Sequence, residues 1–302
     1  MNLSKSYEVI IVGGSYAGLS AAMALGRSLR SVLIIDANNP CNRQTPHSHN
    51  FITQDGEAPH KIAQKAKEQV LKYDTVEFLD DTAISGKNNE KGFTIRTIAG
   101  KEFEGRKLIF ATGIKDIMPN IEGFSKCWGV SAIHCPYCHG YEFRNEKTAI
   151  MANGEHAFHI ASLVNNLTNE LSIYTQGKPE FTDDQLKKLS NNNIAIVTDT
   201  IKTFEHSKGA IKRVLFENGT SQTVKAIYAA LPFEHHTQLP EMLGCTFDEG
   251  GFIKTDLFQK TEIPGIYACG DNSQKMRSVA NAAASGTVSG AMVNYELTQE
   301  DF

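Results

Sequence analysis

No stretch of the sequence approaches the roughly 18 consecutive apolar residues that a membrane-spanning helix needs. Neither sign of charge dominates, since 30 Lys and Arg stand against 34 Asp and Glu, a formal net charge of −4. This balance gives no electrostatic reason to expect a nucleic acid or an anionic membrane surface as a partner. We therefore predict a protein that binds neither nucleic acids nor membranes.

Cysteine is also scarce: six in 302 residues are too few for a secreted scaffold held together by disulfides. The N-terminus has one Lys before a short apolar run that breaks at Gly13-Gly14, which is not the pattern of a signal peptide. The sequence therefore predicts a cytoplasmic protein. Only two residues separate Cys135 from Cys138, and the other four cysteines are single: Cys41, Cys127, Cys245 and Cys269.

The sequence does contain a repeated pattern of buried-type strands and helices. Its length and its 41% hydrophobic content are those of one large or two medium globular domains. An apolar run at 7–12, a glycine turn, a helix-prone segment at 17–29 and an apolar run at 32–36 have the size of a βαβ unit. A weaker copy of this pattern begins near Lys147, and the segment after Gly265 resembles the first βαβ unit again. Two α/β units are therefore expected, with the second inserted into the first.

The remaining periodic segments complete this expected α/β pattern. The other expected helices are 58–73, 155–166, 182–190 and 279–297, and the other expected strands are 93–98, 107–111, 149–152, 171–175, 211–217 and 224–230.

A glycine-rich turn follows the first strand and opens the first helix. Its residues are Gly13, Gly14, Ser15, Ala17 and Gly18. Gly13 permits a tight turn and Gly18 permits close helix–strand packing, so the helix N-terminus can take a pyrophosphate on its N–H groups. Asp36 ends the second strand, where a carboxylate can accept hydrogen bonds from a ribose. Ser15 replaces the middle glycine of that fingerprint, so a purely structural turn stays an alternative.

Two later segments carry residues of the same kind. Ala111-Thr112-Gly113 ends an apolar strand, and Gly265-Ile-Tyr-Ala-Cys-Gly-Asp271 precedes a helix rich in small residues. Together with the glycine turn, they resemble the signature set of flavoproteins with two dinucleotide-binding domains. The resemblance implies that the chain binds FAD, with Gly270 and Asp271 at the ribityl chain of that cofactor.

Four kinds of chemistry are possible for His134-Cys135-Pro136-Tyr137-Cys138-His139. Cys-x-x-Cys-His is the attachment pattern of c-type haem, which needs export and usually a further axial ligand. A zinc site needs four ligands, whereas the other cysteines here are single and distant. The two thiols could also be a structural pair. The hypothesis that we favour is a redox-active dithiol, because this spacing allows a small-loop disulfide to form and break.

His139 directly follows the second cysteine of that pair. Histidine titrates near neutral pH, so this side chain is placed to move a proton when a thiolate forms or attacks. We therefore expect Cys135, Cys138 and His139 to be the catalytic residues, and we expect no metal. The alternative is that His139 is an ordinary surface residue.

A flavin and a Cys-x-x-Cys pair in one chain of this length resemble the low-molecular-weight thioredoxin reductases, over nearly the whole chain. The resemblance implies two Rossmann-like dinucleotide-binding domains of three layers (ββα), the second inserted into the first. They are an FAD-binding domain at 1–116 and 244–302, and an NAD(P)-binding-like domain at 117–243 that carries the dithiol. It also implies a homodimer.

The same resemblance implies a path for electrons, from NADPH to FAD, to the disulfide and on to thioredoxin. Cys138 matches the cysteine that faces the flavin, and Cys135 matches the one that attacks the disulfide of the protein substrate. A thioredoxin-like protein or a small dithiol or disulfide is therefore the expected partner. The family has an Asp where this chain has His139.

The middle region departs from that family at the expected nicotinamide site. Its turn offers Asn153, Gly154 and Ala157, but Ala152 stands at the first glycine position, where a Cβ intrudes on a pyrophosphate. Glu155 adds a negative charge at the helix start, which repels a phosphate. The arginine cluster that clamps the phosphate of NADP is also missing. Binding of NAD(P)H is therefore left open between a diverged working site and a lost one.

If that site is lost, the chain resembles a second branch of the same fold, the dithiol oxidases of epidithio natural products such as gliotoxin and holomycin. These also carry Cys-x-x-Cys-His-Gly, as in Cys138-His139-Gly140. In that branch a small dithiol reduces the disulfide, and O₂ reoxidises the flavin. A branch fed by ferredoxin and a non-catalytic, flavin-bound redox sensor are further alternatives. The sequence leaves open the electron donor, the thiol substrate and the role of Cys41, for which a simple loop thiol is the commoner case.

Overall fold

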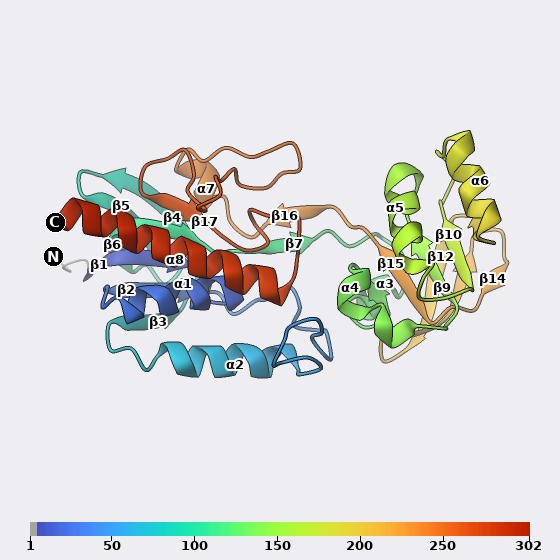
Figure 1. The fold of residues 1–302 in the computed structure, drawn as a ribbon, viewed down its shortest axis with the longest axis horizontal. Helices are drawn as coiled ribbons and strands as arrows, with labels where there is room; N and C mark the ends of the chain where they lie inside the picture. The colour runs from blue at the N-terminus through green and yellow to red at the C-terminus, as the bar shows by residue number, and fades with distance from the viewer. Residues whose placement is uncertain (1–4) are drawn as a thin grey trace. The chain divides into compact units, whose positions relative to one another are not determined.

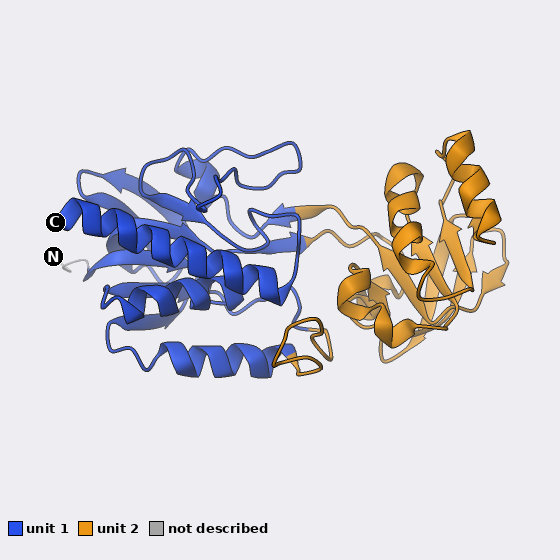
Figure 2. Cartoon of the chain, viewed as in Figure 1, with its two compact units in different colours: residues 1–43, 59–115, 234–302 blue, residues 44–58, 116–233 orange. Residues whose placement is uncertain are grey.

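A computed structural model describes residues 5–302, so the first four residues of the expected FAD-binding domain lie outside the described part of the chain. The chain divides into two units, coloured separately in Figure 2. Unit 1 contains the residues up to Arg43, Pro59–Lys115 and Glu234–Phe302, and unit 2 contains Gln44–Ala58 and Asp116–Phe233.

Figure 1 shows the elements of both units and labels most of them. Unit 1 contains β1 (Lys5–Val12), α1 (Tyr16–Arg27), β2 (Val32–Asp36), α2 (Pro59–Val70), β3 (Val76–Asp80), β4 (Ala83–Asn89), β5 (Gly92–Thr97), β6 (Glu102–Phe110), α7 (Leu239–Met242), β17 (Ile266–Ala268) and α8 (Val279–Asp301). Unit 2 contains α3 (Phe124–Cys127), β8 (Ala132–Ile133), α4 (Pro136–His139), the 3₁₀ turn η1 (Tyr141–Phe143), β9 (Thr148–Met151), α5 (Gly154–Val164), β10 (Leu171–Tyr174), α6 (Asp183–Asn191), β11 (Ala195–Val197), β12 (Ile201–Ser207), β13 (Ala210–Phe216), β14 (Ser221–Gln222) and β15 (Ala226–Ala229). The chain passes between the units on either side of Gln44–Ala58 and again in β7 (Ile114–Asp116) and β16 (Phe233–His235), two strands that pair with each other.

Unit 1 is built on a sheet in which β3, β2, β1, β6 and β17 are parallel, while β5 and β4 continue from β6 as antiparallel strands. Successive residues of β1 enter two different cores. Val9 and Ile11 pack with α1, α2 and α8, whereas Ile10 and Val12 pack with β5 and α7. A parallel strand buried on both faces is apolar throughout, which explains the continuous apolar run in the sequence.

Helices α1 and α8 approach each other closely because α8 carries glycines at the contact. A Cβ at Gly286 would lie 2.1 Å from the carbonyl oxygen of Ala17, and one at Gly290 would lie 2.5 Å from that of Ala21. No side chain fits in such a space, so the small-residue character of α8 sets its distance from α1. This contact places α8 beside the turn that opens α1.

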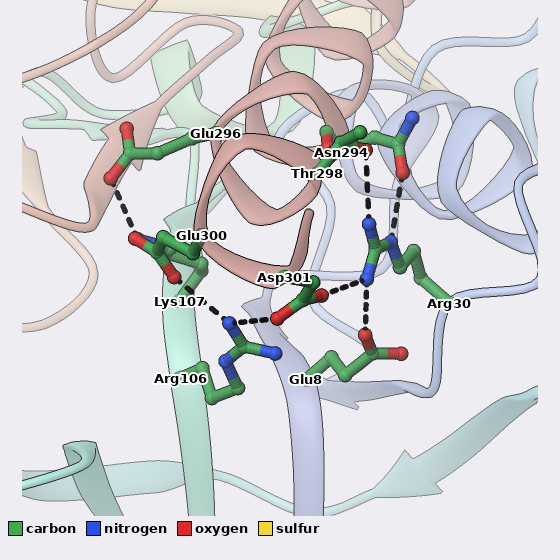
Figure 3. Close-up of polar contacts among 9 residues, drawn as sticks. All are labelled: Glu8, Arg30, Arg106, Lys107, Asn294, Glu296, Thr298, Glu300 and Asp301. Carbon is green, nitrogen blue, oxygen red and sulfur yellow. Dashed lines mark hydrogen bonds and ion pairs between the residues drawn. The ribbon is translucent and has the colours of Figure 1, made fainter.

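The C-terminal turns of α8 are held to the sheet by a network of charged side chains, shown in Figure 3. Arg30 is mostly buried and bonds to Glu8 at 2.6 Å and to Asp301 at 2.7 Å. Lys107 is 5% exposed and lies 2.6 Å from Glu296. The members of the network are Glu8, Arg30, Arg106, Lys107, Asn294, Glu296, Thr298, Glu300 and Asp301. Because buried charges are costly without partners, this network matters for the stability of unit 1.

Replacing Glu296 by Gln is expected to lower the free energy of unfolding by about 1.5–3 kcal/mol near neutral pH. Burial disfavours ionisation of Glu296, but hydrogen bonds from Lys107, Lys260 and Tyr267 outweigh it and lower the pKa of this carboxyl to about 2. A lowered pKa stabilises the folded state above the ordinary value of 4.5, and this contribution is lost as the pH falls towards 2. Urea unfolding of both proteins should therefore show a difference that shrinks over this pH range. A difference that does not change with pH would contradict the assignment.

Unit 2 repeats the same plan in a smaller form. Strands β11, β10, β9, β15 and β8 form a parallel sheet in that order. One face of the sheet packs against α5 and α6 through residues such as Ile150 and Ile173. The other face packs against the antiparallel strands β12 and β13 through Ala149 and Ile227, among others.

The predicted fold class is confirmed, because both units have a mainly parallel sheet with helices on one face and antiparallel strands on the other. The sequence pattern missed β3, β4, β11 and β12 and the short strands β7, β8, β14 and β16. In β4 only Ala83 is fully buried, and the strand ends in polar, exposed residues, so it has little apolar signal. Over residues 5–302, no helix combines the length and the apolar character that crossing a membrane requires.

The units do not follow the expected domain limits 1–116, 117–243 and 244–302 at every point. The loop 44–58 belongs to unit 2, although the sequence places it within the first expected segment. Residues 234–243 belong to unit 1, because Leu239 and Leu243 pack into the core beneath β5. The division into an FAD-binding and an NAD(P)-binding-like domain stays a prediction.

Candidate active site

In unit 1, the carboxyl ends of three parallel strands meet at the glycine turn. The N–H of Ala111, which follows β6, donates to the carbonyl of Val12 at the end of β1. Gly13 has φ 106°, and a Cβ there would lie 2.2 Å from the carbonyl oxygen of Ala111. Only glycine fits this position, because the backbone conformation is left-handed and the neighbouring strand end occupies the space.

The other residues of the turn are equally crowded. A Cβ at Gly18 would lie 1.9 Å from the carbonyl oxygen of Gly13, so the helix packs directly on the turn. The N–H of Gly14 donates to Oδ1 of Asp36 at 2.8 Å, and Oδ2 of the same carboxylate accepts from the N–H of Asn38 at 3.2 Å. Asp36 therefore holds the turn and the loop after β2, and a carboxylate keeps lone pairs for a further donor.

Gly270 and Asp271 follow β17 at the same edge of the sheet. The N–H of Cys269 donates to the carbonyl of Phe110, and a Cβ at Gly270, where φ is 83°, would lie 3.0 Å from the Cβ of Ala17. These contacts bring Gly270 next to the first turn of α1. All the predicted FAD-binding residues thus lie in unit 1, at the ends of β1, β2, β6 and β17 and at the start of α1: Gly13, Gly14, Ser15, Ala17, Gly18, Asp36, Ala111, Thr112, Gly113, Gly270 and Asp271.

Asn272 is a residue of this edge that the sequence interpretation missed. It is completely buried, and its amide nitrogen donates to the carbonyl of Phe110 at 2.9 Å and to the hydroxyl of Thr112 at 3.1 Å. Its Oδ1 atom is buried and has no hydrogen-bond partner among the described residues. Its position directly after the Gly-Asp pair in the sequence was the signal that could have identified it as a site residue.

These features fit the group that the FAD signature implies. The N-cap of α1, Ser15, makes no side-chain hydrogen bond to the helix, so no side chain of its own covers the positive end of this helix. The glycines let a ligand approach the backbone, and the unpaired Oδ1 of Asn272 offers an acceptor. The residues that would hold FAD are therefore those of the α1 turn, Asp36 and the segment Gly270–Asn272.

Cys41 lies at the same edge, which the sequence could not show. Its thiol is 3.9 Å from Oδ2 of Asp271, and Nε of Arg277 is 3.8 Å from the same oxygen. Asp271 is thus placed between a thiol and a guanidinium. Cys41 is half-buried and belongs to the surroundings of this carboxylate rather than to the Cys135 pair.

In unit 2, the Cys-x-x-Cys segment forms the short helix α4. Cys135 is its N-cap and Pro136 its first residue, a position where the missing N–H of proline costs nothing. The Sγ atoms of Cys135 and Cys138 lie 2.7 Å apart, and neither residue is fully buried. The two sulfurs are therefore close to each other and accessible.

The imidazole of His139 is the titratable side chain that ends this helix. Its pKa is lowered, first by burial and then by the neighbouring His49, while Glu142 acts in the opposite direction. A lowered pKa keeps the ring neutral at neutral pH, which is the form that accepts a proton. Cys135 and His139 are four residues apart along one helical turn, a spacing at which side chains are neighbours.

Three of the other cysteines are buried in hydrophobic cores and differ clearly from this pair. Burial raises the pKa of Cys127 and Cys245 to about 11 and that of Cys269 to about 12. Such thiols stay protonated and unreactive at neutral pH. Within residues 5–302, no three His, Cys, Asp or Glu side chains are grouped so that they could hold a metal ion.

The expected nicotinamide turn between β9 and α5 is occupied by the chain itself. The side-chain oxygen of Asn153 accepts from the N–H of Gly154 at 2.9 Å and from that of Glu180 at 3.0 Å. Its amide nitrogen donates to the carbonyl of Lys178 at 2.9 Å. The N-cap of α5 therefore ties the loop 178–180 to the start of the helix, in contrast to the N-cap of α1.

Two carboxylates lie at this turn. Glu155 is in the first turn of α5, where Gln185 donates to it at 2.5 Å. The backbone of Glu180 is bonded to Asn153, as described above. Ala157 is fully buried in the core, so its side chain is not available to a ligand. The residues present do not fit a pyrophosphate, because a side chain already caps this helix and two carboxylates lie at the turn.

Comparison with known proteins decides the family. The model of the pyridine nucleotide-disulphide oxidoreductase family matches residues 7–286. The chain belongs to this family. The oxidoreductase is 31% identical to thioredoxin reductase tcpT of Claviceps purpurea, over 98% of this chain and 96% of that protein.

Solved structures agree with this assignment. The oxidoreductase superimposes on the putative thioredoxin reductase TrxB from Bacillus anthracis with a TM-score of 0.93 and 30% identity, covering 98% of this chain and 100% of the other. It superimposes on HlmI with a TM-score of 0.93 and 26% identity, covering 100% and 96% of the two chains. The resemblance to thioredoxin reductases with features of gliotoxin- and holomycin-type oxidases is thereby confirmed.

The oxidoreductase is an enzyme of the thioredoxin-reductase-like, flavin-dependent kind. FAD is its cofactor, as predicted, and thioredoxin reductases of this family use NADPH as well. A non-catalytic redox sensor is not favoured. The similarity to thioredoxin reductases implies thioredoxin or another disulfide as the substrate class.

Proposed function

We propose that Cys135 and Cys138 are the redox pair of this enzyme, and that electrons pass between the flavin, this pair and a thiol or disulfide substrate. The observation that carries the proposal is the distance of 2.7 Å between the two sulfurs, on a short helix where neither is fully buried. Three of the remaining cysteines are buried with raised pKa values and cannot take this role.

Each residue of α4 has a separate task in this proposal. Cys138 exchanges electrons with the cofactor, and Cys135 exchanges with the substrate by thiol–disulfide attack. His139 accepts the proton of a thiol as the thiolate forms and returns it when a thiol is regenerated. When bound, FAD accepts or gives the two electrons that are equivalent to one disulfide.

Tyr228 lines the dithiol from β15, the strand between β8 and β9. Burial raises the pKa of its hydroxyl, and the charges of Cys135 and Glu142 raise it further. The hydroxyl therefore stays protonated and can donate a hydrogen bond to a thiolate.

Reductive titration of the purified protein with dithionite under anaerobic conditions tests the redox pair. A flavin alone takes up two electrons, whereas a flavin and one disulfide together take up four. We expect four electrons per chain. An uptake of only two by protein whose disulfide is oxidised beforehand would refute the proposal.

A second candidate function is the oxidation of a small dithiol with O₂ as the electron acceptor. One observation favours it: the side chain of Asn153 closes the start of α5, with Glu155 and Glu180 at the same turn. A helix N-terminus that is already capped by a side chain and flanked by carboxylates is a poor binding site for the pyrophosphate of a nicotinamide nucleotide.

Anaerobic mixing with NADPH, NADH and dithiothreitol in separate experiments distinguishes the two directions of electron flow. Loss of the flavin absorbance with dithiothreitol but with neither nucleotide would support dithiol oxidation. Rapid loss with NADPH would support a reductase and exclude the second candidate.

We also propose that the enzyme works in the cytoplasm as a homodimer. The low number of cysteines and the absence of long apolar runs support the location, and the family resemblance supports the dimer. A thioredoxin-like protein or a small dithiol remains the proposed partner.

A further inference from the structure

A short loop of unit 2 places a second histidine beside the dithiol helix. The loop 44–58 is closed by hydrogen bonds between the backbones of Ser48 and Glu57 at 2.8 Å and of Gly56 and Ser48 at 2.8 Å. Within it, the N–H of Asn50 donates to Oδ1 of Asp55 at 2.7 Å. These contacts fix the position of His49, which none of the sequence motifs pointed to.

His49 stands between two carboxylates and the imidazole of His139. Its Nε2 atom is 3.6 Å from Oε1 of Glu142, and its Nδ1 atom is 3.7 Å from Oδ2 of Asp55. The rings of His49 and His139 meet edge to face, with centroids 6.2 Å apart and an interplanar angle of 90°. The side chain of His49 is 20% exposed, while those of Glu142 and Asp55 are 37% and 67% exposed, so solvent screens the contact to Asp55 more than the contact to Glu142.

We propose that His49 takes the positive charge of this imidazole pair and thereby leaves His139 neutral, ready to accept a proton from the neighbouring thiols. His49 is then a positioning residue that acts through His139, and not a catalytic residue itself. This inference rests on the proposed role of the dithiol.

The distribution of charges around the pair supports this assignment. Two carboxylates, one near each ring nitrogen, can pair with His49 when that ring carries a proton. The groups that act on the ring of His139 are His49, which opposes its protonation, and Glu142, which favours it. Two cations at this separation repel each other, so the second imidazole stays neutral.

The other elements packed against α4 carry titratable groups of their own. On α5, His156 is influenced by burial and by His159, not by His139. On β15, Tyr228 is influenced by Cys135 and Glu142. His47, on the same loop as His49, bonds through Nδ1 to the carbonyl of Gly56 at 2.9 Å, and its ring centroid is 6.4 Å from that of His49.

The step that depends on this arrangement is a proton transfer in which no electrons move. A thiol of the reduced pair gives its proton to neutral His139, which leaves a thiolate and an imidazolium. Were His139 already protonated, it could not accept this proton, and the thiol would have to release it to solvent instead. The charge on His49 therefore extends the pH range of activity towards acid.

The variant His49→Gln tests the inference in the FAD-loaded protein. Nuclear magnetic resonance titration of ¹³C-labelled histidines, with His139 assigned from the spectrum of His139→Asn, measures the coupling directly. We expect the pKa of His139 to rise in His49→Gln. His47→Gln is the matched control, since it removes an imidazole from the same loop without removing the contact to His139.

The second readout is the rate at which dithiothreitol reduces the bound flavin as a function of pH. The ionisation of the reagent is common to all variants, so ratios of rates report on the protein. For His49→Gln we expect a several-fold lower rate at about pH 6 and an unchanged rate at about pH 8.5. A loss of rate that is equal at all pH values would indicate a merely structural role and overturn the inference.

Asp55→Asn provides a second variant, should His49→Gln fold poorly. Removing this carboxylate weakens the hold on the charge of His49, so the pKa of His139 should move in the same direction by a smaller amount. An unchanged pKa of His139 in both variants, or an equal rise in His47→Gln, would refute the coupling. The dithionite titration still reports four electrons in that case, so failure of this inference is distinguishable from failure of the proposed redox pair.

Discussion

The variants Cys138→Ser and Cys135→Ser are each expected to lose dithiol-dependent turnover by a factor on the order of 10³ or more. A serine hydroxyl has nearly the size of the thiol but forms neither a thiolate at neutral pH nor a disulfide. Because the two sulfurs are 2.7 Å apart, either substitution removes the whole redox pair. The measurement is flavin reduction by dithiothreitol in stopped flow, together with the electron uptake of each variant.

The electron uptake should fall from four to two per chain in both variants, because only the flavin remains to be reduced. Cys245→Ser is the matched control. This thiol is buried, and burial raises its pKa to about 11. It forms a hydrogen bond with the side chain of Thr261, which could equally bond to a serine hydroxyl. The control should keep the uptake of four. An uptake of four in Cys138→Ser would show that the second electron pair resides elsewhere.

The variant Gly13→Ala is expected to bind FAD at least about tenfold more weakly than the unmodified chain, or to be isolated without it. A non-glycine residue in a left-handed conformation costs about 1–2 kcal/mol, which is close to a factor of 10 on its own. In addition, the new Cβ would lie 2.2 Å from the carbonyl oxygen of Ala111, so the ends of β1 and β6 must separate. That movement displaces the turn at which the cofactor is held.

Gly100→Ala is the matched control for this prediction. Gly100 also has a left-handed conformation, with φ 78°, but apart from its own two chain neighbours no described residue comes within 4 Å of the position that a Cβ would take. It therefore carries the backbone cost without the collision. The ratio of flavin to protein absorbance after purification measures both variants, and similar FAD loading of Gly13→Ala and Gly100→Ala would contradict the argument from crowding.

Most of the longer parallel strands and their crossover helices were predictable because their signals are local, although β3 was missed. The segment 32–36 coincides with β2, and the strand expected at 171–175 differs from β10 by one residue. The antiparallel layer was harder to predict. Strand β4 is stabilised mainly by pairing with β5, and most of its side chains are exposed, so its sequence carries little hydrophobic periodicity.

The residues of the candidate site also divide into those that the local sequence predicts and those that depend on contacts between distant segments. The glycine turn and the Cys-x-x-Cys pair are continuous in the chain, and their spacing alone restricts the chemistry. Asn272, His49 and Glu180 were missed because each acts through a partner that is distant in the chain. The amide of Asn272 reaches the end of β6, and the backbone of Glu180 reaches the side chain of Asn153.

Local spacing alone was thus enough to predict an α/β fold with a nucleotide-binding turn and a dithiol, since these features are encoded by neighbouring residues. The flavin followed from the resemblance to a known family. Local spacing could not establish that His49 stands between Asp55 and Glu142, or that Asn153 closes the start of α5. Those contacts depend on how loops far apart along the chain fold against one another. Charge and hydrogen bonding act over a few ångströms in space, and sequence separation does not report that distance.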